Sequence, residues 1–126
     1  MYCPWSPNDT DKYTAAGITR MQQQALNFIT QCQAVGTYPV LMTPNPANGL
    51  TAPQEAYRLQ IVAWTKALCA TGIARLIDRD AVYTDYTTGV GGYKTGLNAD
   101  TLHPNQTGYT LESQVGWQPL VATFFG

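Results

Sequence analysis

An aspartate and the single histidine of the chain lie three residues apart in the stretch ADTLHPNQTGY, residues 99–109. A carboxylate that braces a histidine holds the ring in one tautomer and stabilises its charged form, which lets the ring act as a general base. Asp100 and His103 therefore suggest half of a hydrolytic site. The alternative is a polar turn in which Asp100 caps and His103 only packs.

A second polar group occurs near the beginning of the chain, in the stretch PWSPND, residues 4–9. The side-chain amide of Asn8 could donate a hydrogen bond to an oxyanion. Asn8 and Asp9 could equally cap the helix that follows, as short polar side chains often do. Together with Asp100 and His103, Asn8 would complete two thirds of an acyl-transfer site.

Two helices are expected in the first part of the chain. Apolar residues recur at helical spacing from Thr10 to Gly36, and Asp9, Thr10 or Asp11 is expected to cap this helix. A second helix is expected over residues 51–72, because a capping-box-like start precedes an apolar segment that ends at a glycine.

Short apolar runs beside these helices are typical of buried parallel strands. One strand is expected to end near Trp5, one to cover residues 38–43 and one to cover residues 74–78. Because strands and helices alternate, the sequence predicts an α/β fold with a parallel sheet. Three strands make a thin sheet whose edge must be covered, so either the chain is the later part of a larger fold or a partner supplies the rest.

The last part of the chain is expected to form a long loop and a third helix. Residues 84–98 are rich in glycine and tyrosine, and a structureless loop of this length is more often functional than not. The helix is expected over residues 105–126, with Gly116 and Pro119 kinking or ending it.

Composition and charge exclude several classes of protein. The 126 residues fit a single domain, and a net charge of -1 leaves no basic stripe for nucleic acid. No run is long enough to span a membrane, and residues 1–12 lack the features of a signal peptide, so we expect synthesis in the cytoplasm. Cys3, Cys32 and Cys69 have neither metal-site nor disulfide-framework spacing. We predict no metal and no cofactor.

A surface with few charges, built from Thr, Asn, Gln, Tyr and Gly, suits sugar ligands. Tyr86, Tyr93 and Trp5 are the candidate substrate-binding residues, because aromatic rings can stack on the face of a sugar. The two tyrosines belong to the long loop at residues 84–98. Ordinary packing in the loop or the core is the alternative for all three side chains.

These motifs make the chain resemble the C-terminal portion of the SGNH hydrolases, the GDSL-type esterase and lipase family. The last motif of that family is matched by Asp100, His103, Pro104, Asn105, Gly108 and Tyr109. The third motif, Gly-x-Asn-Asp, is approximated by residues 6–9, with serine in place of glycine. The resemblance runs over nearly all of the chain. It implies a three-layer, flavodoxin-like fold from which the N-terminal strands, including the nucleophile strand, are absent.

The chain departs from the family in its first two motifs. The nucleophilic Gly-Asp-Ser and the glycine of the oxyanion hole both precede the asparagine motif in the family, and here seven residues precede Asn8. The only serines are Ser6, inside the asparagine motif, and Ser113, inside the expected last helix. Neither fits the strand-end turn of a nucleophile, so the nucleophile is missing from this chain.

The resemblance implies a mechanism once a serine is supplied. His103 would take the serine proton, Asp100 would hold the imidazole, and Asn8 would stabilise the tetrahedral intermediate. The reaction would be hydrolysis of acyl esters, with acetyl groups on a polysaccharide as a natural case. We expect an upstream segment, another chain or a second copy of this chain beside the first strand.

The alternative is a non-catalytic module of the same fold, used for carbohydrate binding or oligomerisation. Domains resembling this one occur in secreted bacterial esterases and on phage tail fibres and spikes, and the neutral composition favours the phage setting. Met1 as a true start would favour the module, and Met1 as an internal residue would favour the enzyme.

Overall fold

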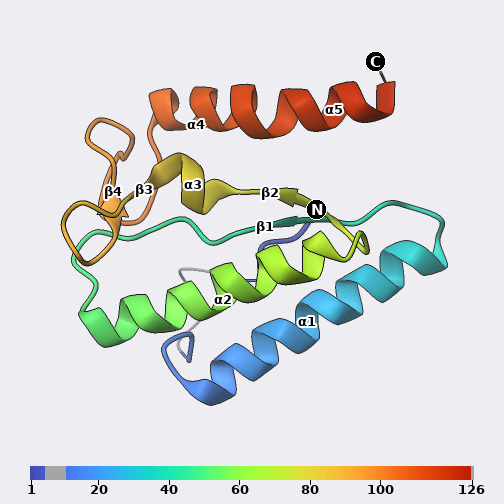
Figure 1. Ribbon diagram of the computed structural model, residues 1–126, viewed down its shortest axis with the longest axis horizontal. Coiled ribbons are helices and arrows are strands. Elements are labelled where there is room, and N and C mark those ends of the chain that lie inside the picture. Colours follow the sequence, from blue (N-terminus) through green and yellow to red (C-terminus); the bar gives the residue numbers. More distant parts are fainter. Residues whose placement is uncertain (5–10, 126) are drawn as a thin grey trace. The chain divides into compact units, whose positions relative to one another are not determined.

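The computed structural model describes residues 1–4 and 11–125 of the chain. These residues group into two compact units (Figure 1). The first unit comprises Met1–Pro44 and Ala52–Ile77, and the second comprises Asn45–Thr51 and Asp78–Gly126. The expectation of a single domain over residues 1–126 stays a prediction.

The first unit is built on parallel strands. β1 (Val40–Met42) pairs in parallel with β2 (Arg75–Ile77), with Leu41 opposite Leu76. On the other side of β1, Tyr2 forms a parallel bridge to Leu41. The predicted strand near the N-terminus is therefore represented by Tyr2, whereas Trp5 lies outside the described residues. The predicted α/β fold with parallel strands is confirmed.

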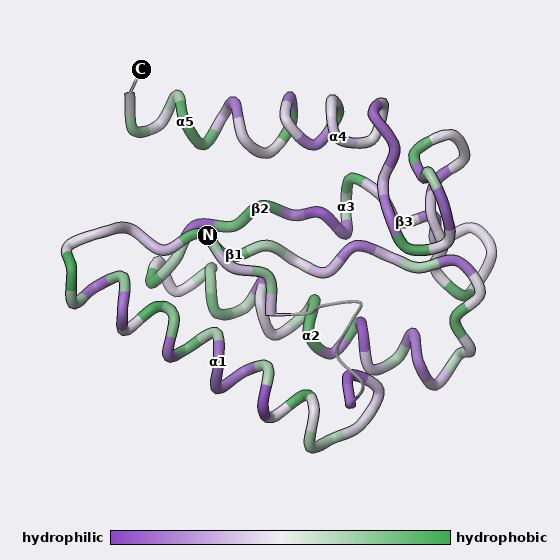
Figure 2. The backbone as a smooth tube through the Cα atoms, turned by 180° about the vertical axis from the view of Figure 1, so that it is seen from behind, coloured by the Kyte–Doolittle hydropathy of each residue, from purple (hydrophilic) through white to green (hydrophobic). Residues whose placement is uncertain are grey.

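Two long helices lie on the same side of these strands (Figure 1). They are α1 (Ala15–Ala34) and α2 (Ala52–Ala70). Apolar residues recur along α1 between polar ones, as the alternating colours of Figure 2 show. The buried residues Ile29 of α1 and Leu41 of β1 meet in one core cluster, so the apolar face of α1 turns toward the sheet.

The predicted cap of the first helix is wrong where the structure describes it. Thr14, not Asp11, caps α1, and its hydroxyl accepts a hydrogen bond from the backbone N–H of Gly17 at 3.0 Å. Asp11 instead accepts from the guanidinium of Arg20, with its Oδ2 2.9 Å from Nε. Asp9 and Thr10, the other two candidates, lie outside the described residues. Three possible caps in a row made the sequence ambiguous. Of these, only Asp11 is described, and its carboxylate pairs with Arg20.

A buried ion pair lies at the beginning of α2. Arg58 is fully buried and Glu55 is nearly so, and Arg58 Nε donates to Glu55 Oε2 at 2.7 Å. Arg58 Nη1 also donates to the carbonyl of Pro44 at 3.2 Å. Buried charges are tolerated when they are paired and hydrogen-bonded in this way.

The second unit begins with a short helix and a hairpin where a loop was predicted. α3 (Arg79–Tyr83) leads into β3 (Thr84–Asp85), which pairs antiparallel with β4 (Gly92–Tyr93). The prediction of a structureless loop over residues 84–98 is therefore wrong in part. Strands of two residues are too short to show the alternation on which a strand prediction depends.

The third predicted helix is present but does not end at Gly116 or Pro119. It runs through α4 (Gln106–Glu112), the π-helical segment η1 (Ser113–Trp117) and α5 (Gln118–Phe125). A proline ring clashes with the carbonyl four residues earlier in an α-helix, and for Pro119 that residue lies in η1. The wider π turn thus lies directly before the turn that contains Pro119, and the helix continues through α5.

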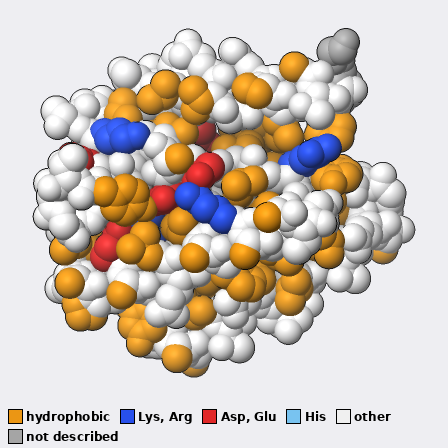
Figure 3. All heavy atoms as spheres, viewed as in Figure 1, with side chains coloured by type: hydrophobic (Ala, Val, Ile, Leu, Met, Phe, Trp, Pro, Cys, Tyr) orange, Lys and Arg blue, Asp and Glu red, His pale blue; other side chains and the backbone are white. Residues whose placement is uncertain are grey.

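The side chains on the face shown in Figure 3 are mostly hydrophobic or uncharged, with a few acidic and basic groups among them. This agrees with a chain in which 12% of the residues are charged. None of the helices in the described ranges is both long and apolar enough to cross a membrane.

Candidate functional site

Asp100 and His103 form a hydrogen-bonded pair in the second unit. His103 Nδ1 lies 2.8 Å from Asp100 Oδ2 and 3.1 Å from Oδ1. Asp100 Oδ1 also accepts the backbone N–H groups of Leu102 at 2.7 Å and of His103 at 2.8 Å. The carboxylate therefore shapes the turn and also holds the ring. The two interpretations of the motif, turn and braced histidine, are both realised.

Hydrogen bonds stabilise the ionised carboxylate of Asp100. The backbone N–H of Leu102, followed by the ring and backbone N–H of His103, lowers the pKa of Asp100 to about 2. Asp100 is thus ionised at neutral pH and favours the tautomer that carries a hydrogen on Nδ1. In that tautomer of a neutral imidazole, Nε2 has the free lone pair. Both side chains are a little over half exposed, at 56% and 57%, so Nε2 is accessible to a reacting group.

Asn105 fixes the loop on which the pair stands. Its Oδ1 accepts from the backbone N–H of Gly108 at 2.9 Å and caps α4, while its Nδ2 donates to the carbonyl of Gly96 at 2.8 Å. The backbone N–H of Ala99 donates to the carbonyl of His103 at 2.8 Å and closes the loop. Asn105 thus stabilises the loop and caps α4.

Gly108 lets α4 approach this loop closely. A Cβ at this position would lie 2.6 Å from the carbonyl oxygen of Leu97 and 2.9 Å from Cε1 of Tyr83. The Tyr83 hydroxyl lies 3.1 Å from the carbonyl oxygen of Gly108 and 2.5 Å from Glu112 Oε2. Only glycine leaves room for this contact between the helix and the loop.

Residues that sequence reasoning missed hold the same loop from the other side. The backbone N–H of Asn48 donates to the carbonyl of Thr101 at 2.8 Å. The carbonyl of Leu102 accepts from Asn45 Nδ2 at 3.0 Å and from the hydroxyl of Tyr93 at 2.8 Å. Asn45 and Asn48 follow the strand predicted at residues 38–43, and polar residues after a strand are the signal that could have identified them.

The candidate substrate-binding residues fall in different surroundings. Tyr86 is 54% exposed and its hydroxyl donates to the buried carboxylate of Asp80 at 2.8 Å, so its ring remains a candidate. Tyr93 is 7% exposed and packs edge-on against Tyr83 at a centroid distance of 5.7 Å, so its stacking role stays a prediction for the little of its ring that is exposed. Burial raises the pKa of Tyr93 to about 12. Trp5 lies outside the described residues.

The remaining predicted site residues are only partly described. Asn8 and Ser6 lie outside the described residues, and Ser113 lies in η1. Among the described residues, no hydroxyl group forms a hydrogen bond with Nε2 of His103. Residues 1–4 and 11–125 bring together no group of three side chains that could hold a metal ion.

Two solved structures are similar to this chain. One is a proposed acylhydrolase from Bacteroides fragilis, with a TM-score of 0.73 and 18% identity over 91% of this chain and 59% of that one. The other is a proposed lipolytic protein of the G-D-S-L family from Desulfitobacterium hafniense, with a TM-score of 0.60 and 19% identity over 77% of this chain and 52% of that one. No protein-family model and no curated protein matches the sequence.

At these identities the likeness shows the fold. The chain has a mixed α/β fold with parallel strands, similar to that of GDSL-type hydrolases. It spans 59% and 52% of the length of the two similar proteins.

Proposed function

We propose that this chain is the C-terminal part of an SGNH-type serine esterase that hydrolyses acyl esters, with acetyl groups on a polysaccharide as the substrate class. One observation carries the proposal: the ionised carboxylate of Asp100 holds Nδ1 of His103 and leaves the accessible Nε2 as a base. The similarity of the fold to GDSL-type hydrolases supports it.

In this proposal the proton moves through one ring nitrogen. Nε2 of His103 accepts the proton of the nucleophilic serine as the serine oxygen attacks the ester carbonyl. The imidazolium then returns this proton to the alcohol oxygen as the ester bond breaks, and Asp100 stabilises the positive charge in between. Water repeats the sequence on the acyl-enzyme and restores the serine.

The serine would come from a part of the protein other than these 126 residues. The two similar proteins are longer than the region this chain matches, which leaves room for a further segment. That segment, or another chain, would lie beside Tyr2, on the side of the N-terminal strand that does not face β1. Asn8 would supply an oxyanion donor, and its replacement by alanine would lower kcat by about 100- to 1,000-fold.

The test compares p-nitrophenyl acetate hydrolysis by residues 1–126 and by a product that includes the upstream coding sequence. The longer product is expected to be active, and D100N is expected to lower its kcat by roughly 10³- to 10⁴-fold, because the ring loses its fixed tautomer. D78N, which removes a charge from the N-cap of α3 and preserves capping, is the control.

Two results would contradict the proposal. Activity of residues 1–126 alone that depends on His103 would show that the nucleophile is already present. A longer product without His103-dependent activity would favour the alternative, a non-catalytic module for carbohydrate binding or oligomerisation in a phage tail spike or fibre. Sedimentation analysis adds a check, since a chain that is monomeric with nothing beside Tyr2 would count against a missing strand.

A further inference from the structure

A polar pocket adjoins the loop that carries Asp100 and His103. It is lined by residues 48–50 and by residues of the hairpin from Asp85 to Tyr93, and its volume is about 320 Å³. This volume lies at the lower end of the range for small-molecule sites, roughly 300–1,000 Å³. The pocket therefore suits one small chemical group rather than an extended chain.

Two residues of the pocket lining are hydrogen-bonded to the catalytic loop. Asn48 donates its backbone N–H to the carbonyl of Thr101, and Tyr93 donates its hydroxyl to the carbonyl of Leu102, each at 2.8 Å. Thr101 and Leu102 are the two residues between Asp100 and His103. The pocket lining and the loop of the pair are thus joined directly through Asn48 and Tyr93.

The pocket lining contains one acceptor with a full negative charge. Asp85 Oδ1 accepts from the hydroxyl of Thr87 at 2.6 Å and from its backbone N–H at 2.8 Å. The Thr87 hydroxyl, followed by the Thr87 backbone N–H, lowers the pKa of Asp85, so the carboxyl is ionised at neutral pH. Its second oxygen remains an acceptor for the hydroxyl of a ligand.

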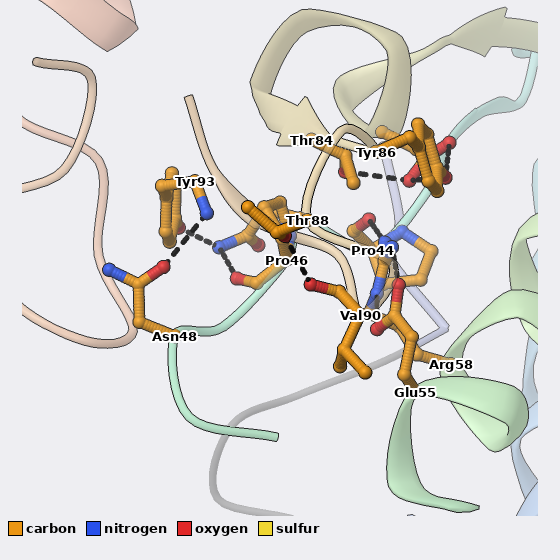
Figure 4. A network of polar contacts seen from close by, with 12 residues as sticks. Pro44, Pro46, Asn48, Glu55, Arg58, Thr84, Tyr86, Thr88, Val90 and Tyr93 are labelled. Atoms are coloured by element: carbon orange, nitrogen blue, oxygen red, sulfur yellow. Dashed lines mark hydrogen bonds and ion pairs between the residues drawn. The ribbon is translucent and has the colours of Figure 1, made fainter. Parts of the chain in front are cut away.

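The lining also contains a donor. Asn48 Oδ1 accepts the backbone N–H of Tyr93 at 2.8 Å. Figure 4 shows that the nitrogen of the same side-chain amide points away from Tyr93. No described residue accepts a hydrogen bond from that nitrogen, so it can donate to a ligand. An amide and a carboxylate in the lining of one pocket match a group that both donates and accepts, as a hydroxyl does.

The rest of the lining is apolar or backbone. Leu50 and Val90 contribute apolar side chains, and Gly49 has open space where a side chain would stand, so a ligand can approach the main chain there. The lining contains no lysine, arginine or histidine that could neutralise an anion. A ligand with an apolar face and several hydroxyl groups fits this combination, and an acidic ligand would be repelled by Asp85.

We propose that this pocket is a subsite for one neutral sugar ring, with Asp85 accepting from its hydroxyls and the Asn48 amide donating to them. The assignment of that ring to the alcohol part of the ester substrate rests on the proposed function. The binding of the sugar ring does not rest on the proposed function, because binding needs no serine and no chemical step.

The experiment is an amide NMR titration of the ¹⁵N-labelled chain with the methyl glycosides of glucose, galactose, mannose and N-acetylglucosamine, and with glucuronate. At least one neutral glycoside is expected to shift the amides of residues 48–50 and 85–93, and glucuronate is expected to bind more weakly than its neutral counterpart. D85N is expected to weaken the neutral glycoside about tenfold and to remove the discrimination against glucuronate. D78N, which removes a charge outside this pocket, should change neither.

Three results would overturn the proposal: no shift in these segments with any of the four glycosides, binding of glucuronate as tight as that of its neutral counterpart, or unchanged binding in D85N. The H103N variant separates this failure from that of the proposed function. Sugar binding without any His103-dependent hydrolysis would contradict the proposed esterase function and support the proposed subsite. His103-dependent hydrolysis without sugar binding would remove the subsite and keep the esterase.

Discussion

At the scale of single residues, one carboxylate performs two tasks. Asp100 uses Oδ1 to accept two backbone N–H groups, which fixes the turn, and presents Oδ2 to the ring of His103. The backbone contacts follow from the spacing of the two residues, because an aspartate readily accepts from N–H groups two and three positions later. The motif therefore preorganises its own histidine before any other part of the molecule contributes.

We predict that Asp100 titrates near pH 2, well below an ordinary aspartate at about 3.9. H103A should raise this pKa without restoring the ordinary value, because both backbone N–H donors remain. The folded-state pKa is lowered, so the stabilisation by Asp100 is present above pH 4 and is lost as the pH falls toward 2. Carboxyl ¹³C NMR measures the midpoint directly, and a midpoint near 4 in the unmodified chain would contradict the described contacts.

At the scale of elements, the loop is held between the start of α4 and the segment 45–51. Asn105 and Gly108 belong to the helix side, and Asn45 and Asn48 belong to the other. The close contact of α4 with the loop thus explains why the family-like motif has asparagine at position 105 and glycine at position 108. Both residues stabilise the loop that carries His103.

We predict that G108A destabilises the fold in spite of the higher helix propensity of alanine. The new Cβ would lie 2.6 Å from the Leu97 carbonyl oxygen, a backbone atom that cannot move without shifting the loop. Such overpacking costs about 1–3 kcal/mol. Urea unfolding of G108A and of T107A, an exposed position on the same helix, checks this. Equal stability of the two variants would argue against the close contact.

At the scale of the whole molecule, stability depends on buried polar groups in both units. Arg58 is buried against Glu55 in the first unit, and Tyr83 is buried against Glu112 in the second. Burial, together with the hydrogen bond to Glu112, raises the pKa of Tyr83, and burial raises that of Tyr93 to about 12. Both phenols thus favour the neutral form in the folded chain.

We predict that the free energy of unfolding falls as the pH rises from about 10, the ordinary pKa of tyrosine, through about 12. The sign follows from linkage, since in this interval the folded chain keeps protons that the unfolded chain has lost. Y93F should lose less stability over this interval, although at pH 7 it should be about 1 kcal/mol less stable for want of its hydrogen bonds. Urea unfolding at pH 7, 9.5 and 11 measures this, with the exposed Tyr109→Phe as control. A loss in Y93F as large as in the unmodified chain would contradict the burial of Tyr93.

The sequence by itself determined the long elements and the pairing of Asp100 with His103. Helical spacing over some twenty residues and short apolar runs are local signals, and they located α1, α2, β1 and β2 within a few residues. The spacing of Asp100 and His103 left a plain polar turn as the alternative, and the residues that follow His103, with the order of the elements, favoured the braced histidine. The bracing is formed within one turn of four residues.

Tertiary structure alone decided what depends on residues distant in sequence. Asn45 and Asn48 contact the loop of His103 from more than fifty positions away. Their place after a strand marks them as candidate site residues, but only the folded chain shows which loop they contact. The same holds for Tyr93, which a surface-like loop sequence presented as a sugar platform and which packing against Tyr83 buries. Local preferences fix helices and turns, whereas burial and the partners of polar groups are set by the folded chain as a whole.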